Sequence, residues 1–179
     1  MAATAPWPGM AAPGGDATLT ATSQTQGNTL TNGFGGQDGT SSPIIAAFSN
    51  TVNVDASAFT GHLTISGSDD NDTMTFGTGG TTVYATTGSD TYTFNNAASD
   101  KIVYTAANQS NGSSSTDTIN HFDVANDKID ISAIAQANWT FSAPNANTLD
   151  IDLNNDSTTD IVITVTGVAQ SITLADFIA

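Results

Sequence analysis

Aspartate supplies every acidic side chain of this 179-residue chain. There are seventeen Asp and no Glu, against two Lys (Lys101 and Lys128) and no Arg. The short Asp side chain caps turns and holds its carboxylate oxygens close to the main chain. Carboxylate and carbonyl oxygens are also the ligands that Ca²⁺ prefers. Together with sixteen Gly, this composition predicts an all-β protein built from turns and short strands, with many oxygen donors for calcium.

The charge balance excludes several classes of partner. The formal net charge is −15, and a compact chain with that charge repels itself unless cations or an open architecture relieve it. Two lysines cannot neutralise a row of phosphates, so we expect no nucleic acid partner and no binding to an anionic membrane surface. We also expect no membrane span, because no apolar run approaches about 18 residues. The chain has no Cys, which rules out disulfides and thiolate chemistry.

A nine-residue period begins near Gly61. Three blocks align, namely residues 67–75, 76–84 and 85–93, and apolar residues recur nine apart at Ile65, Met74, Val83 and Tyr92. A repeat this short cannot form a helical solenoid. It fits a parallel β-roll in which each block contributes one tight turn and one short strand.

The rest of the chain reads as further strands and turns. We expect a flexible lead over 1–15, a strand-rich segment over 16–60, the roll over 61–134 and an antiparallel C-terminal cap over 135–179. Strands are predicted at 17–22, 43–48 and 51–54, where polar and apolar residues alternate. Helical periodicity is nearly absent, and only 133–137 and 174–178 suggest a helical turn.

The repeats resemble the RTX (repeats-in-toxin) nonapeptide, Gly-Gly-x-Gly-x-Asp-x-apolar-x. The three blocks match it in part, through Gly67, Asp72 and Met74, then Gly77, Gly79 and Val83, then Gly88, Asp90 and Tyr92. Ser68 and Asp70 replace expected glycines. The resemblance implies a calcium-binding β-roll.

The C-terminal half is similar to the C-terminal domain of serralysin-type proteases. The run 117–134 looks like the segment that follows the repeats there, and 150–167 looks like the last hairpins. The end, 172-ITLADFIA-179, resembles an uncleaved type I secretion signal. The resemblance covers about residues 61–179 and implies export by type I secretion machinery. Residues 52–68 are similar to stretches of RTX-bearing surface-layer proteins.

The spacing of the repeats places the candidate calcium ligands. Consecutive turns of a β-roll lie on alternate edges, so turns eighteen residues apart stack. Asp72 and Asp90 have that spacing, and each could bind Ca²⁺ together with backbone carbonyls. The candidates on this edge are Gly67, Asp69, Asp70, Asp72, Gly88 and Asp90. A solvated acidic turn without a metal is the alternative, and Thr81 weakens the opposite edge.

Further Asp residues leave two interpretations open. Asp100 and Asp117 keep the Asp-x-apolar signature outside the strict period, so they either continue the roll after insertions at 95–99 and 108–115 or are turn residues before strands. Asp152, Asn154, Asp156 and Asp160 stand at positions 1, 3, 5 and 9 of a loop. They resemble the start of an EF-hand-type loop, although an Asp/Asn-rich hairpin turn explains them more simply.

The sequence favours a structural role. It holds two His and no His-Glu-x-x-His zinc motif, so we expect no enzyme. The leading hypothesis is a secreted RTX-type protein that folds on Ca²⁺ and self-assembles with copies of itself at the bacterial cell surface, with a surface polysaccharide as a further partner. The alternatives are an export and folding module of a larger secreted enzyme or adhesin, and an ice- or carbohydrate-binding solenoid. Thr-x-Thr at 73–75 and 91–93 invites the last, although only three repeats align in the sequence.

Overall fold

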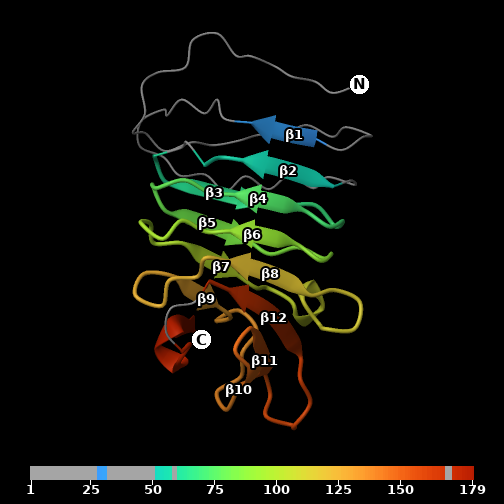
Figure 1. Ribbon diagram of the computed structural model, residues 1–179. Helices are drawn as coiled ribbons and strands as arrows, with labels where there is room; N and C mark the ends of the chain where they lie inside the picture. The colour runs from blue at the N-terminus through green and yellow to red at the C-terminus, as the bar shows by residue number, and fades with distance from the viewer. Residues whose placement is uncertain (1–27, 32–50, 58–59, 168–170) are drawn as a thin grey trace.

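Two sheets face each other across a narrow core in the computed structural model, which describes residues 28–31, 51–57, 60–167 and 171–179. From β2 to β9, successive strands alternate between the sheets and wind downward toward the C-terminal end (Figure 1). The larger sheet has the order β1-β2-β4-β6-β8-β12-β11-β10, and the smaller one has the order β13-β9-β7-β5-β3. We call them the long sheet and the short sheet.

The strands are short and most of them pair in parallel. The long sheet contains β1 (Asn28–Thr31), β2 (Val52–Asp55), β4 (Thr73–Thr75), β6 (Thr91–Thr93), β8 (Asp117–Asn120), β12 (Ile161–Thr166), β11 (Thr148–Asp152) and β10 (Thr140–Asn145). The short sheet contains β3 (Leu63–Ser66), β5 (Thr81–Tyr84), β7 (Lys101–Val103), β9 (Lys128–Asp130) and β13 (Phe177–Ile178). The turns between them include two 3₁₀ segments, Ala107–Gln109 and Leu174–Asp176.

The core includes two facing files of apolar side chains, one from each sheet. Because side chains alternate across a strand, one residue of each Thr-x-Thr strand points inward. The long-sheet file is Val54, Met74, Tyr92, Ile119 and Val165. The short-sheet file is Ile65, Val83, Ile102, Ile129 and Phe177. The nine-residue cadence predicted from the sequence is therefore confirmed as a zigzag between two buried files.

The predicted all-β fold and parallel β-roll are confirmed. Strand β4 pairs with β6, and β3 with β5, in parallel and eighteen residues apart. The roll continues through both insertions, since β7 pairs with β5 and β8 pairs with β6. Parallel pairing also begins before residue 61, because β2 lies in register with β4.

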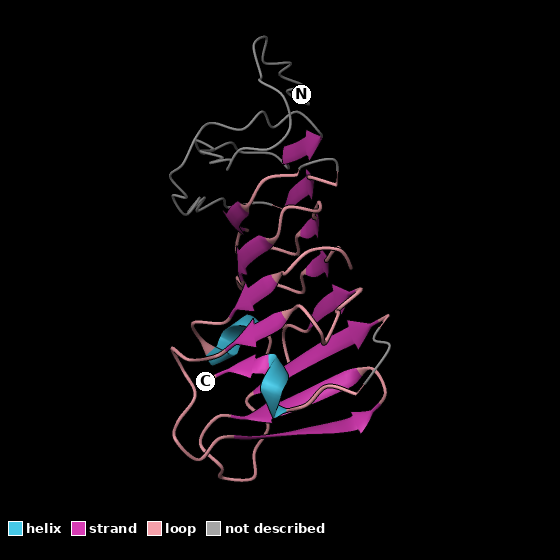
Figure 2. Ribbon diagram, turned by 90° about the vertical axis from the view of Figure 1, so that its left-hand side faces the viewer, coloured by secondary structure: helices cyan, strands magenta, loops and turns pink. Residues whose placement is uncertain are grey.

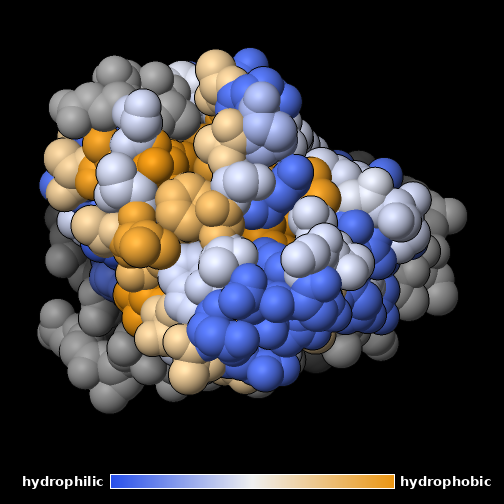
Figure 3. Space-filling model, turned by 90° about the horizontal axis from the view of Figure 1, so that it is seen from below, coloured by the Kyte–Doolittle hydropathy of each residue, from blue (hydrophilic) through white to orange (hydrophobic). Residues whose placement is uncertain are grey.

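The C-terminal end of the roll is closed by the hairpin β10–β11, which pairs with β12 in antiparallel fashion. Strands β12 and β13 rejoin the roll in parallel, beside β8 and β9. Trp139, Phe141 and Phe177 pack together there, with ring centroids 4.9–6.3 Å apart. Seen from this end, the surface is partly apolar and partly a broad hydrophilic patch (Figure 3).

Two smaller predictions have mixed outcomes. The strand expected at 51–54 is β2, whereas those at 17–22 and 43–48 lie outside the described residues. The 133–137 segment is a hydrogen-bonded turn, with the Ile134 and Ala135 amides donating to the Ile131 carbonyl. The 174–178 segment is the 3₁₀ turn Leu174–Asp176 followed by β13. No helix in the described part of the chain is long and apolar enough to cross a membrane.

Substitution of Gly88 tests how closely the coils approach. Its φ is +120°, and an added Cβ would lie 2.6 Å from the Asp70 carbonyl of the neighbouring coil. We expect Gly88→Ala to lower the free energy of unfolding by about 2 kcal/mol, since strained backbone of this kind costs about 1–3 kcal/mol. Urea denaturation measures it. Thr78→Ala, at an exposed turn position, is the matched control, and equal stability of the two variants would contradict this account.

Candidate functional site: two rims of buried aspartates

Five aspartates mark the turns that lead into the strands of the roll. On the long sheet, Asp72 and Asp90 directly precede β4 and β6, and Asp117 begins β8. On the short sheet, Asp100 and Asp127 directly precede β7 and β9. We call these two sets the long-sheet rim and the short-sheet rim. All five side chains are buried, with at most 1% of their surface exposed.

Each of these carboxylates ties its own coil to the preceding coil of the same sheet. On the long-sheet rim, the Val52 amide donates to Asp72 Oδ1 (2.6 Å), the Asp72 amide to Asp90 Oδ1 (2.8 Å) and the Asp90 amide to Asp117 Oδ1 (3.0 Å). The short-sheet rim repeats the pattern. The Thr81 amide donates to Asp100 Oδ1 (2.7 Å), and the Asp100 amide donates to Asp127 Oδ1 (2.8 Å). The aspartate side chain thus supplies the acceptor at the point where the strand ladder starts.

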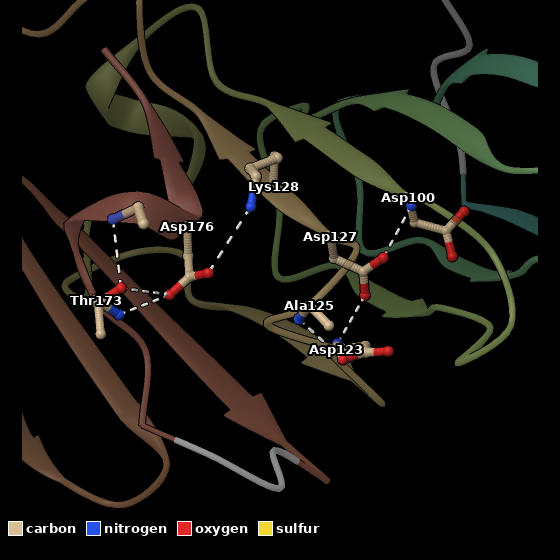
Figure 4. A network of polar contacts seen from close by, with 8 residues as sticks. Asp100, Asp123, Ala125, Asp127, Lys128, Thr173 and Asp176 are labelled. Carbon is tan, nitrogen blue, oxygen red and sulfur yellow. Dashed lines mark hydrogen bonds and ion pairs between the residues drawn. The ribbon is translucent and has the colours of Figure 1, made fainter.

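The second carboxylate oxygen turns back to its own coil. Asp72 Oδ2 accepts the Ser68 amide (2.6 Å), and the Asp100 and Asp127 Oδ2 atoms accept the Asn95 (2.9 Å) and Asp123 (2.8 Å) amides. Figure 4 shows Asp127 between its own turn and Asp100.

Two buried tyrosines complete the long-sheet rim. Tyr92 OH donates to Asp90 (2.8 Å) and Tyr104 OH donates to Asp117 (2.9 Å). All five rim aspartates thus link adjacent coils, and all except Asp117 also accept a hydrogen bond from their own turn.

Ser110 ends the long-sheet rim. In β12 the register position beside Asp117 is Ile163, whose side chain has no hydrogen-bond acceptor. The Asp117 amide donates instead to the Ser110 hydroxyl (2.8 Å), and that hydroxyl donates to the Val162 carbonyl. Ser110 therefore joins the last rim aspartate to the cap. Neither Ser110 nor Asp127 was among the predicted site residues, although Asp127-Lys128-Ile129 repeats the Asp-x-apolar signature 27 residues after Asp100.

Burial and mutual repulsion disfavour the charged form of the rim aspartates. Burial raises the pKa of Asp117 to about 8, and the negative charge of Asp90 adds to the rise. Burial likewise raises the pKa of Asp90 and of Asp127 to about 6. The two lysines pair with aspartates outside the rims. Lys101 Nζ lies 3.3 Å from Asp130, and Lys128 Nζ lies 3.8 Å from Asp176, a pair that Figure 4 shows.

Outside the 152–160 loop, the predicted calcium candidates fall into four groups. Asp72, Asp90 and Asp117 come together on the long-sheet rim, and Asp100 lies on the opposite rim. Gly67 and Gly88 provide close packing, since an added Cβ at Gly67 would lie 2.0 Å from Asp72 Oδ2. Asp69 and Asp70 are exposed and do not join the buried file; Asp69 accepts instead from the Thr87 hydroxyl (3.1 Å).

The loop from Asp152 to Asp160 has the contacts of a hairpin turn. The Asp152 carboxylate accepts the amides of Asn154, Asn155, Asp156 and Ser157 at 2.6–3.3 Å. Asp160 Oδ2 accepts the Leu153 amide (2.8 Å) at the base of the turn. These oxygens serve the turn's own backbone, which agrees with the Asp/Asn-rich hairpin interpretation.

The oxygen chemistry of the long-sheet rim fits Ca²⁺ without forming a carboxylate cage. A carboxylate can accept about four hydrogen bonds, and Asp117 accepts two. No cluster of three or more Asp or His side chains poised for a metal occurs within the described ranges. A cation at this rim would therefore rely on Asp72, Asp90 and Asp117 together with backbone carbonyls, and would offset their repulsion.

The parallel coils and their aspartate rims define a β-roll module. Residues 20–144, more than two thirds of the chain, match the family described as "Peptidase M10 serralysin C terminal". The chain therefore belongs to this family, which is the non-catalytic C-terminal domain of the peptidases. The match begins at residue 20, well before the region of about 61–179 that carried the sequence resemblance. No curated protein matches the chain.

Removing one rim carboxylate tests its role as a backbone acceptor. Asp90→Ala leaves the Asp72 amide and the Tyr92 hydroxyl without an acceptor, and we expect a loss of about 3 kcal/mol, since a buried unsatisfied group costs about 1–3 kcal/mol. Asp90→Asn keeps an acceptor oxygen and should lose less. Chemical denaturation compares both with Asp69→Ala on the exposed turn. A cost of Asp90→Ala no larger than that of Asp69→Ala would refute the assignment.

The raised pKa values predict how stability depends on pH in metal-free protein. Because the folded state holds these protons more tightly than the unfolded state, where the pKa of Asp is 3.8, the stabilising effect is complete below that value. This stabilising effect is lost as pH rises, through about 6 for Asp90 and through about 8 for Asp117. Unfolding free energies measured across this range in chelator should therefore fall. Asp117→Asn should flatten the upper part of the curve, and an unchanged curve in that variant would show that Asp117 does not titrate there.

Proposed function

We propose that this chain is a secreted, non-catalytic β-roll module that calcium stabilises outside the cell. The long-sheet rim supports this proposal most directly. It stacks three buried carboxylates without a lysine partner, in a chain of net charge −15. Membership in the serralysin C-terminal family supports the same conclusion. Asp72, Asp90 and Asp117 are the residues that would hold the ion, and the ion would neutralise their charge.

The negative charge of the chain links folding of the module to the calcium concentration, and so to export. Where free Ca²⁺ is scarce, weak sites stay empty and repulsion among the carboxylates opposes folding. Outside the cell, millimolar Ca²⁺ would fill sites with a Kd of about 10⁻⁴–10⁻³ M. Binding to the folded state alone then stabilises it by mass action. Export through type I secretion machinery is part of this proposal.

A role as the folding and export module of a larger secreted protein accords with the family better than a lattice-forming role does. The family is one domain of a peptidase. In addition, the edge strand of the long sheet at the C-terminal end is β10, which contains Pro144 and an irregular register between Ser142 and Asn145. Proline and bulges prevent an edge strand from pairing with another chain. Self-assembly at the cell surface remains the second candidate, and electron microscopy of the purified chain in calcium tests it.

Calcium titration tests the main proposal. Thermal unfolding followed by circular dichroism is measured in chelator, in Ca²⁺, and in Mg²⁺ at equal ionic strength. We expect Ca²⁺ at ten to a hundred times Kd to add about 1.4–2.7 kcal/mol of stability. Mg²⁺ should add less, because it demands octahedral geometry and gives up water reluctantly.

The matched variants are Asp90→Asn with Asp117→Asn, which removes two rim charges, and Asp152→Asn in the hairpin turn. The calcium effect should shrink in the first and persist in the second. Equal stabilisation by Mg²⁺ and Ca²⁺ would mean general charge screening and would defeat the proposed site.

A further inference from the structure

The loop between the 3₁₀ turn Ala107–Gln109 and strand β8 turns on an Asn-Gly pair. It leaves the roll after Ser110, passes through Asn111 and Gly112, and returns at Ser115. Ser110 and Ser115 are buried, Asn111 is half-buried and Gly112 is exposed. Loops of this kind connect the stacked strands along the sides of the roll (Figure 2). This one stands where the last rim aspartate meets the cap, because Ser110 contacts both.

The fold favours glycine at position 112. The φ angle of Gly112 is +72°, a left-handed value that other residues rarely adopt. A Cβ added there would lie 2.5 Å from Cγ2 of Val162 on β12. The Gly112 amide also donates to the Ser115 carbonyl (2.7 Å). Backbone conformation and packing against the cap therefore select this residue type.

The fold also uses both ends of the Asn111 carboxamide. Its Oδ1 accepts the amides of Ser113 and Ser114 (both 2.9 Å), which closes the turn. Its Nδ2 donates to the Ser114 hydroxyl (3.1 Å). An Asn side chain can accept and donate at once, so it suits this turn. The structure thus places a carboxamide directly before a glycine.

An asparagine before a glycine can react with the main chain, because glycine has no side chain to hinder its own amide nitrogen. We propose that Asn111 is a site of spontaneous deamidation, and that folding of this loop controls the reaction. The Gly112 nitrogen attacks Asn111 Cγ and forms a new C–N bond, its proton passes to the departing Nδ2, and ammonia leaves. Water then opens the cyclic imide at either carbonyl, which gives aspartate or isoaspartate without oxidation or reduction.

The folded loop engages both reacting groups. The Gly112 N–H is directed at the Ser115 carbonyl, and three hydrogen bonds fix the Asn111 carboxamide. Amides on a carbonyl oxygen can stabilise an oxyanion, but only when the nucleophile reaches the carbon and releases its proton. Here the bond to Ser115 holds that proton. Asn111 therefore reacts when the loop opens, and the rate follows the population of the open loop.

The isoaspartate product is incompatible with the junction between the rim and the cap. It inserts one methylene group into the main chain between residues 111 and 112 and adds a negative charge. Directly before it, the Ser110 carbonyl accepts the Val162 amide (2.7 Å), and the Ser110 hydroxyl accepts the Asp117 amide (2.8 Å). The extra backbone atom displaces these partners, and the new charge stands one residue from a contact of Asp117. Deamidation thus weakens the link between the last rim aspartate and β12.

Peptide mapping of the full chain tests the proposal. Trypsin cleaves only after Lys101 and Lys128, so the peptide 102–128 carries Asn111, and the chain's other Asn-Gly pair, 32–33, falls in a different peptide. The protein is incubated folded, as circular dichroism confirms, and unfolded in guanidinium chloride. Mass and isoaspartate content follow the reaction. We expect Asn111 to react about tenfold or more slowly in folded protein, because only the open loop reacts.

Refolding of aged protein tests the consequence. Wild type aged in the unfolded state should recover less β signal under folding conditions, with isoaspartate at position 111 concentrated in the fraction that stays unfolded. Asn111→Ser is the matched control, because a serine hydroxyl can serve the same kind of turn without a carboxamide to lose. This variant should refold as well after ageing as before.

Two results would overturn the proposal. One is a rate at Asn111 that is equal or faster in folded protein, and the other is full refolding of wild type that carries isoaspartate at position 111. The rate comparison uses wild type alone, so it holds whether or not Asn111→Ser folds. It compares folded with unfolded protein whichever ions the buffer contains, so its outcome is separate from calcium binding at the rims, which the titration above measures.

Discussion

The hydrogen bond from a main-chain amide to the aspartate of the next coil is the interaction on which the roll depends. Each roll strand from β4 to β9 has only three or four residues, so the parallel ladder between two coils holds few bonds. An aspartate at the start of the strand adds one more bond between coils and fixes the preceding turn at the same time. Five of these side chains, on two rims, repeat the arrangement.

This use of aspartate has an electrostatic consequence. Coils stack at the strand spacing of about 4.8 Å, so the same side chain that links the coils also brings like charges into a buried file. Burial, together with repulsion from neighbouring carboxylates, raises the pKa of Asp90 and Asp117, and the two lysines pair with Asp130 and Asp176 instead. The folded state therefore gains from any cation or proton that reaches the rim, which connects the architecture to calcium.

The short repeat divides its positions among three tasks. The apolar residue of each strand fills the core, the aspartate before the strand joins the coils, and the residues on either side of the apolar one face solvent. On β4 and β6 the residues on both sides of the apolar one are threonines, whereas the corresponding positions on β7 and β9 include Lys101, Lys128 and the buried Asp130. The outer faces of the two sheets thus differ along these strands, while Asp55 on β2 and Asp150 on β11 place acidic groups on the outer face of the long sheet.

The sequence by itself determined the local repeat. The cadence of Ile65, Met74, Val83 and Tyr92 was sufficient to predict alternating strands and a buried file, because the side-chain period of a strand and the length of one turn are local properties. The eighteen-residue spacing of Asp72 and Asp90 likewise predicted that these two would stack.

Only the tertiary structure decided which partners meet after the period breaks. Asp127, Ser110 and the threonines of β8 and β12 reach their places through insertions and a hairpin, and no short pattern encodes a register set by contacts between distant segments. The partners of the Asp152 carboxylate were also undetermined, because the same spacing of oxygens can surround an ion or its own turn. In each case a side-chain oxygen takes its role from the donors around it, and only the folded structure decides whether these belong to its own turn or to another coil.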